Sequence, residues 1–122
     1  MSETVIDGAA LRRLLEVIGG DPEDLTELLE DYFEGAPALV AKLQAAAEAG
    51  DFDAMRLAAH TLKSNARDFG ALSLAVSCEA LEQACREGPV EGSVEKVQAI
   101  AAQEAAARQV LADLEVDGLD SL

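Results

Sequence analysis

Apolar side chains return at every third or fourth position through most of this 122-residue chain. The clearest run consists of Phe52, Met55, Ala59, Leu62, Ala66 and Phe69. On an α-helix such positions share one face, which packs against a core. Half of the residues are hydrophobic but only 3% are aromatic, and alanine is frequent while β-branched residues are sparse, which favours closely packed helices over a sheet. The pattern predicts an all-α fold.

Glycine, proline and aspartate mark the expected ends of the helices. A short first helix is expected to begin near Asp7 and to stop at the glycine pair 19–20. Asp21 followed by Pro22 is typical of a helix start. The apolar spacing then continues through Pro37, which predicts one long helix kinked there, with a break as the alternative. Further helices are expected over 52–69, over 71–87, and from 93 to an acidic tail at 117–122.

Four long amphipathic helices joined by short connections predict an antiparallel four-helix bundle. The short first helix is expected to cap this bundle. A chain of 122 residues suffices for one core but not for two, so we expect a single domain over 1–122 with its core at about 7–115.

The charge balance excludes several classes of partner. A net charge of −15 and a pI near 4.1 would repel the phosphate backbone of nucleic acids and an anionic membrane surface. No apolar run approaches the roughly 20 residues that span a bilayer, and the N-terminus lacks the layout of a signal peptide. We therefore expect a cytoplasmic protein that binds neither nucleic acid nor membrane.

Cys78 and Cys85 indicate neither a disulfide nor a metal centre. They are seven positions apart on one predicted helix, about 10 Å along its axis, which is beyond disulfide reach. With one histidine in the chain, they give no zinc spacing, and no calcium-binding loop is present. We expect buried thiols in a reducing compartment, and neither a metal ion nor a cofactor.

His60 is the one histidine of the chain, and it lies one residue off the apolar face of its helix. Helical spacing aligns it with Arg56, Lys63 and Arg67, so three of the nine basic residues share its face. One interpretation is structural: an imidazole at the edge of the core beside a solvated helix face. The other is chemical, because an exposed imidazole is a good nucleophile towards an activated phosphoryl group. In that case Lys63 offsets charge on the phosphoryl oxygens, and the small Ser64 leaves room for a partner.

The residues around His60 resemble those of a known family. The similarity rests on His60-Thr61-Leu62-Lys63-Ser64-Asn65 with Gly70-Ala71 ten residues after the histidine, on Gly50-Asp51 before it, and on Cys78 and Leu81-Glu82 after it. This set resembles the histidine-containing phosphotransfer (HPt) domain of multistep phosphorelays, over about residues 7–115. The resemblance implies an up-down four-helix bundle with an additional N-terminal helix. It also implies that His60 is phosphorylated, that Lys63 assists it electrostatically, and that Gly70 shapes the turn below the site.

The chain departs from the family pattern beside the histidine. Family members commonly have Gly and then Ser after the lysine, whereas this chain has Ser64 and Asn65, so clearance over the imidazole is tighter or the hydroxyl adds a hydrogen bond. Many members place a Gln of the neighbouring helix near the imidazole, and the corresponding position here is Glu82 or Gln83. Arg86, one turn further, matches a basic position that some members use in docking.

The resemblance further implies the partners. The chain has no glycine-rich phosphate loop, so it is not expected to phosphorylate itself from ATP. The phosphoryl group is expected to come from the aspartyl phosphate of one receiver domain, in a response regulator or a hybrid histidine kinase, and to pass to another, with Mg²⁺ held by that partner. A monomer is expected.

Two other functions fit the same pattern: a non-catalytic module that sequesters a receiver, and a dimerising fragment of a histidine kinase. For the site itself, Lys63 is expected to be exposed, so that Lys63→Ala slows transfer without unfolding the bundle. Leu62→Ala is expected to destabilise the core by about 2–5 kcal/mol.

Overall fold

The structure is a computed structural model that describes residues 5–118. Within this range the chain forms five α-helices: α1 (Gly8–Val17), α2 (Pro22–Ala49), α3 (Phe52–Asp68), α4 (Leu72–Glu87) and α5 (Ser93–Asp117). The all-α prediction is confirmed. The predicted tail begins too early, because Asp117 still belongs to α5, and residues 119–122 lie outside the described part.

Short aspartate and glycine signals set the helix boundaries. The side chains of Asp7, Asp21 and Asp51 each accept a hydrogen bond from a backbone N–H in the first turn of α1, α2 and α3 respectively, which satisfies donors that the helix leaves unpaired. Pro22 occupies the first position of α2, where its missing N–H costs nothing. Gly50 ends α2 in the left-handed conformation, with φ +67°.

The long helix α2 runs unbroken through Pro37. Proline cannot donate the hydrogen bond to the carbonyl four residues earlier, yet apolar residues on both sides of it, Ala36 and Val40, are buried in the core. Burial of this continuous apolar face holds the helix together across the missing bond. Of the two alternatives, one helix is confirmed and a break is wrong.

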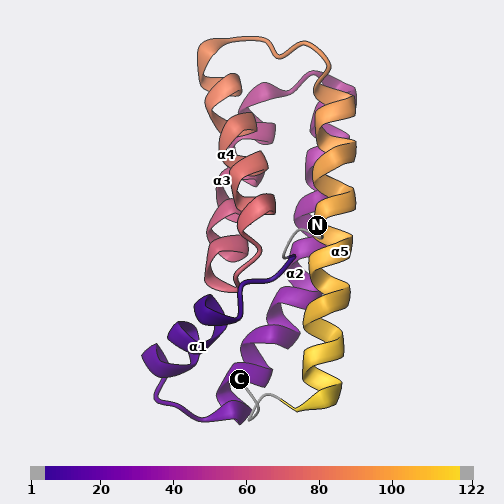
Figure 1. Cartoon of the computed structure of the whole chain (residues 1–122). Coiled ribbons are helices and arrows are strands. Elements are labelled where there is room, and N and C mark those ends of the chain that lie inside the picture. Colours follow the sequence, from indigo (N-terminus) through magenta and orange to yellow (C-terminus); the bar gives the residue numbers. More distant parts are fainter. Residues whose placement is uncertain (1–4, 119–122) are drawn as a thin grey trace, which may run out of the picture.

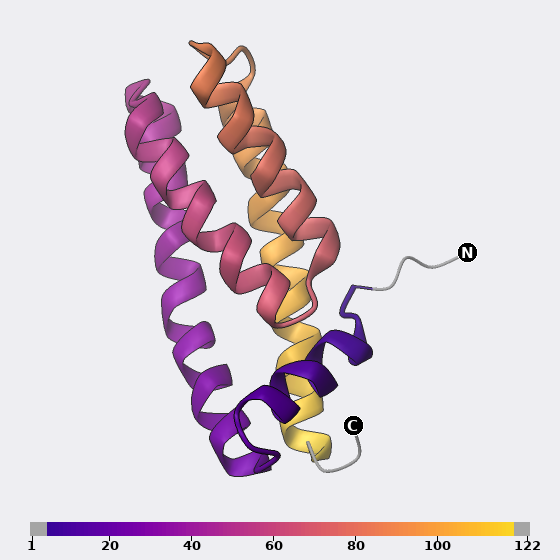
Figure 2. The same cartoon turned by 90° about the vertical axis from the view of Figure 1, so that its left-hand side faces the viewer.

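The helices form a bundle of unequal members (Figure 1). The helices α2 and α5 run along its full length, whereas α3 and α4 cover the upper part of the view and α1 lies across the lower part. Figure 2 shows α1 on the same side of α2 and α5 as the α3–α4 pair. The short helix contacts both α2 and α3. It therefore covers core surface that the shorter α3 and α4 leave open.

The core follows the apolar face predicted for residues 52–69. Met55, Ala59, Leu62 and Ala66 are completely buried, whereas Phe52, at the first position of α3, is only partly buried. The thiols of Cys78 and Cys85 are free, but only Cys78 is fully buried. Burial raises the pKa of the Cys78 thiol to about 12, so this thiol is protonated at neutral pH.

A buried carboxylate interrupts the apolar face of α5. Glu104 is 1% exposed, and its carboxylate accepts a hydrogen bond of 3.2 Å from Arg108 Nε, one turn further along. Burial raises the pKa of Glu104 in spite of this cation. The ionised carboxylate is therefore a destabilising element of the core.

Gly70 joins the turn between α3 and α4 to the segment that precedes α1. The N–H of Asp7 donates a hydrogen bond of 2.8 Å to the Gly70 carbonyl. Gly70 has φ +80°, and a Cβ added to it would lie 2.5 Å from the Asp7 carbonyl oxygen. The position therefore requires glycine for its conformation and for the close approach of another backbone segment.

Candidate functional site

His60 stands on the middle of α3, against α4. Its side chain is 55% exposed, and its Nδ1 lies 2.8 Å from Oε2 of Glu82. Glu82 belongs to α4 and is 4% exposed. Neither residue is near a helix end, so their approach is fixed by the packing of α3 on α4, the most extensive helix pair of the bundle.

Glu82 is ionised although it is buried. The hydrogen bond from Lys63 is the largest influence on its pKa, and the one from His60 acts in the same direction; together they outweigh burial and lower the pKa of Glu82 to about 2. An ionised carboxylate only accepts hydrogen bonds. The imidazole therefore donates through Nδ1–H, and the lone pair of the neutral ring is on Nε2.

Three donors share the Glu82 carboxylate. Lys63 Nζ lies 2.7 Å from Oε1, whereas His60 Nδ1 and Arg86 Nη2 lie 2.8 and 3.0 Å from Oε2. Glu82 is the residue that holds the imidazole, which answers the choice between Glu82 and Gln83. Gln83 is exposed, and its side chain makes no hydrogen bond with any other residue of the described range.

Lys63 does not have the exposure expected for it. Its side chain is only 12% exposed and is paired with the buried Glu82. The expectation that Lys63→Ala leaves the bundle folded rested on an exposed lysine, and that premise is wrong, because the substitution would deprive a buried carboxylate of its shortest ion pair. Helical spacing gave the face of Lys63 correctly, but it carries no information on how deeply the neighbouring helix covers that face.

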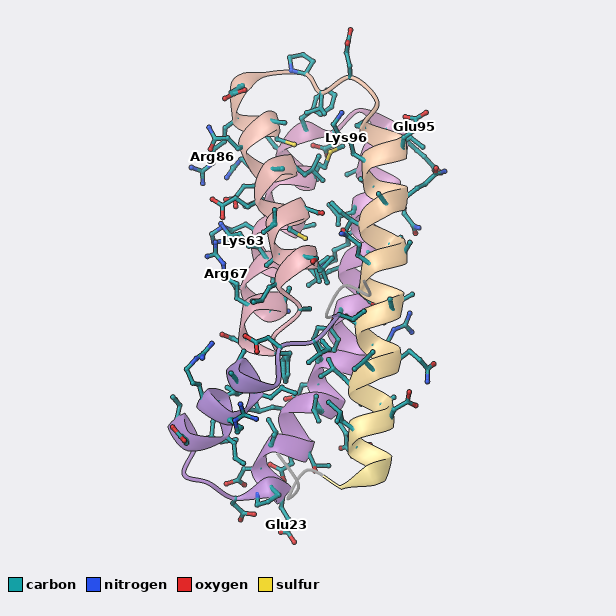
Figure 3. All side chains as sticks on the ribbon, viewed as in Figure 1. Glu23, Lys63, Arg67, Arg86, Glu95 and Lys96 are labelled. Atoms are coloured by element: carbon teal, nitrogen blue, oxygen red, sulfur yellow. The ribbon has the colours of Figure 1, made fainter. Side chains whose placement is uncertain are left out.

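The predicted line of cations exists, and it is largely paired with carboxylates. Figure 3 shows Lys63, Arg67 and Arg86 along one edge of the α3–α4 pair. Arg67 Nη2 lies 2.6 Å from Oε2 of Glu79, and both side chains are more than half exposed. Arg56 has no ion pair within residues 5–118. The pairing of Arg67 with Glu79 was not predicted; the only available signal was the position of Glu79 one turn before Glu82 on α4.

Ser64 stands beside the imidazole but does not bond to it. Its hydroxyl donates a hydrogen bond of 3.4 Å to the backbone carbonyl of His60, within its own helix. Of the two effects expected from a serine at this position, the added hydrogen bond is present, and it is directed to the backbone. The ring remains open to solvent.

Two residues assigned to the site lie elsewhere. Asn65 is on the opposite side of α3, where it lines a hollow together with Leu14 of α1 and Leu28 of α2. Gly70 is ten residues beyond the histidine, about 15 Å along the helix axis, and it contacts Asp7. Gly70 thus shapes the turn that follows the C-terminal end of α3, and its contacts are with the N-terminal segment rather than with the imidazole.

The site thus offers an exposed imidazole nitrogen, an ionised partner for its other nitrogen, and cations on one side. This combination suits nucleophilic attack on an electrophile with negatively charged oxygens.

No group of three or more metal-ligating side chains occurs in the described range. None of the helices within residues 5–118 has the length and apolar character that crossing a bilayer requires.

Comparisons with known proteins identify the family and the fold. The Hpt domain family matches residues 27–115, and no curated protein sequence matches. The chain is similar to the crystal structure of histidine-containing phosphotransfer protein B (HptB) from Pseudomonas aeruginosa PAO1, with a TM-score of 0.82 and 27% sequence identity, over 92% of this chain and 95% of that one. The chain belongs to the Hpt domain family, and it is a phosphotransfer domain that carries a phosphoryl group rather than a kinase.

Proposed function

We propose that the chain is an intermediate of a phosphorelay, in which His60 accepts a phosphoryl group from the aspartyl phosphate of one receiver domain and donates it to another. The observation that carries the proposal is the hydrogen bond from His60 Nδ1 to Glu82 at 2.8 Å on a ring that is 55% exposed. It leaves Nε2 with a lone pair on the solvent side.

The transfer step requires no proton to leave the ring. The lone pair of Nε2 forms the bond to phosphorus while the bond from phosphorus to the aspartyl oxygen breaks, and its electron pair remains on the aspartate carboxylate. The imidazole ring becomes positively charged and keeps its Nδ1–H, which Glu82 Oε2 accepts at 2.8 Å. The carboxylate offsets the new positive charge, so Glu82 acts as a positioning and charge-compensating residue. Donation to the second receiver is the same step in reverse.

Charge favours the receiver as the partner. By family resemblance the phosphorylated pocket of a receiver is acidic and holds Mg²⁺. The chain carries a net charge of −15, yet along one edge of the α3–α4 pair three cations, Lys63, Arg67 and Arg86, outnumber the two carboxylates that pair with them, Glu79 and Glu82. An acidic pocket is attracted to this edge and repelled by the remaining surface, which selects the orientation of docking.

The experiment is transfer from a purified, radiolabelled phospho-receiver in the presence of Mg²⁺. The wild type is expected to acquire a label that is labile in acid and stable in alkali, as phosphohistidine is. His60→Gln retains an amide that can still bond to Glu82, and it is expected to take no label. Thr61→Ala is the matched control, because Thr61 is exposed and its hydroxyl bonds only to the Leu57 carbonyl of its own helix.

Two results would contradict the proposal. A label that persists in His60→Gln excludes this histidine as the acceptor. Binding of the receiver by the wild type without any label identifies a sequestering module instead. ATP alone is expected to label neither the wild type nor His60→Gln.

We also propose that the domain acts as a monomer. The apolar faces of α2, α3, α4 and α5 are buried against one another within a single chain, so the helices of residues 5–118 form their core without a second copy. Sedimentation equilibrium is expected to give the mass of one chain, and a dimer would favour the kinase-fragment alternative.

A further inference from the structure

The cations around Glu82 differ in how freely they can move. Lys63 is 12% exposed, whereas Arg86 is 55% exposed. Both donate to the same carboxylate, but Lys63 is alone on Oε1, and Arg86 shares Oε2 with the imidazole. Arg86 is therefore the cation at the solvent rim, directly beside the ring.

The cost of releasing each cation from Glu82 differs as well. If Arg86 leaves, the buried carboxylate keeps Lys63 on Oε1 at 2.7 Å and His60 on Oε2 at 2.8 Å. If Lys63 leaves, Oε1 loses the one donor that it has within residues 5–118, and a buried acceptor without a partner is strongly unfavourable. The arginine can thus exchange partners at low cost, and the lysine cannot.

The chemistry of guanidinium suits the group that arrives on the ring. A phosphoryl group adds up to two negative charges and three acceptor oxygens. Arginine presents five N–H donors in a planar fork that matches phosphate oxygens, and in this structure Arg86 uses one nitrogen, at 3.0 Å from Glu82.

We propose, on the basis of the phosphotransfer function proposed above, that Arg86 is a catalytic residue: its guanidinium turns from Glu82 to the phosphoryl oxygens when His60 accepts the group, while Lys63 stays on Glu82 and holds the ring. These roles of Arg86 and Lys63 differ from the one implied by family resemblance, in which Lys63 interacts with the phosphoryl group directly. The exchange breaks only hydrogen bonds, so the covalent step is unchanged.

The test separates contact with the phosphoryl group from docking of a protein. Phosphoramidate is a small phosphodonor without a docking surface, and its rate of transfer to His60 is compared with the rate from a phospho-receiver. Arg86→Ala is expected to lower both rates about tenfold or more, since charged hydrogen bonds are worth that much, and Arg86→Lys is expected to restore part of the loss. Arg108→Ala is the matched control, because Arg108 of α5 is also partly exposed (42%) and likewise donates to a buried glutamate one turn away on its own helix, Glu104; it is expected to react with phosphoramidate at the wild-type rate.

A second measurement reports the contact itself. After prolonged phosphorylation, the ³¹P resonance of phosphohistidine is expected to shift in Arg86→Ala and to keep its wild-type position in Arg108→Ala. The proposal is overturned if Arg86→Ala reacts normally with phosphoramidate, if its loss appears only with the receiver, or if the resonance does not move. None of these results affects the assignment of His60, which depends on His60→Gln alone.

Discussion

Replacing Gly70 with alanine tests whether the close approach of the Asp7 backbone matters for stability. Two costs add up at this position. A non-glycine residue at φ +80° costs about 1–2 kcal/mol in the left-handed region. The added Cβ would also lie 2.5 Å from the Asp7 carbonyl oxygen, so the Asp7 segment must move and the hydrogen bond from Asp7 to Gly70 is lost, at about 0.5–1.5 kcal/mol. We expect a total of about 1.5–3.5 kcal/mol.

Gly50 provides the matched control. It has a similar φ of +67°, but a Cβ there meets nothing within 4 Å. Gly50→Ala is therefore expected to cost only the conformational part, about 1–2 kcal/mol. The difference between the two variants isolates the contact with Asp7.

The assay is urea unfolding followed by helical circular dichroism, with amide hydrogen exchange at Asp7 as a local readout. Gly70→Ala is expected to lower the midpoint more than Gly50→Ala does and to accelerate exchange of the Asp7 amide, which is hydrogen-bonded in the wild type. Equal losses in the two variants, with unchanged exchange at Asp7, would refute the reasoning. Because Gly70 lies far from the imidazole, phosphorylation of His60 is expected to persist in the folded variant.

Three further predictions concern buried groups. Lys63→Ala is expected to lower the free energy of unfolding by about 1–3 kcal/mol. Because the pKa of Glu82 is lowered to about 2 in the folded protein, its ionised carboxylate stabilises the fold above the pKa of the unfolded chain. The difference in stability between Lys63→Ala and the wild type should therefore shrink in acid-unfolding curves as the pH falls towards 2. Glu104→Gln is expected to stabilise the protein at neutral pH, because burial raises the pKa of Glu104 and the ionised form is disfavoured. This gain should shrink as the pH falls through that raised pKa and vanish below the pKa of the unfolded chain, and a stabilisation that does not depend on pH would contradict it. Replacing Leu62, which is 0% exposed, with alanine is expected to lower the free energy of unfolding by about 2–5 kcal/mol, as measured by urea unfolding. A decrease below about 1 kcal/mol would place Leu62 outside the core.

The helices could be predicted from local signals, because the residues that start and stop them act within a few positions. Asp21 with Pro22 starts α2, and Gly50 ends it, as the sequence indicated. The face of α3 that meets the core was also predictable, since Met55 and Leu62 are both completely buried and the 3.6-residue period places them together.

The contacts between helices could not be predicted in the same way. Helical spacing showed that His60 and Lys63 share a face, but the register of α4 against α3 decides that Glu82 stands opposite both. That register results from packing over the whole interface, so no short segment of the sequence specifies it. The burial of Lys63 and the orientation of Asn65 away from the site have the same origin.

The position of α1 has a practical consequence for anyone who transplants this domain into a synthetic signalling pathway. The Hpt domain family matches residues 27–115, and a fragment trimmed to those limits would discard α1 together with Leu25. Leu11 and Leu25 are both 0% exposed, so their removal would uncover apolar surface on the remaining helices and deprive Gly70 of its backbone partner Asp7. The limits of sequence similarity are therefore poor cutting points, and an excised piece should retain the chain from before Asp7 if it is to stay folded.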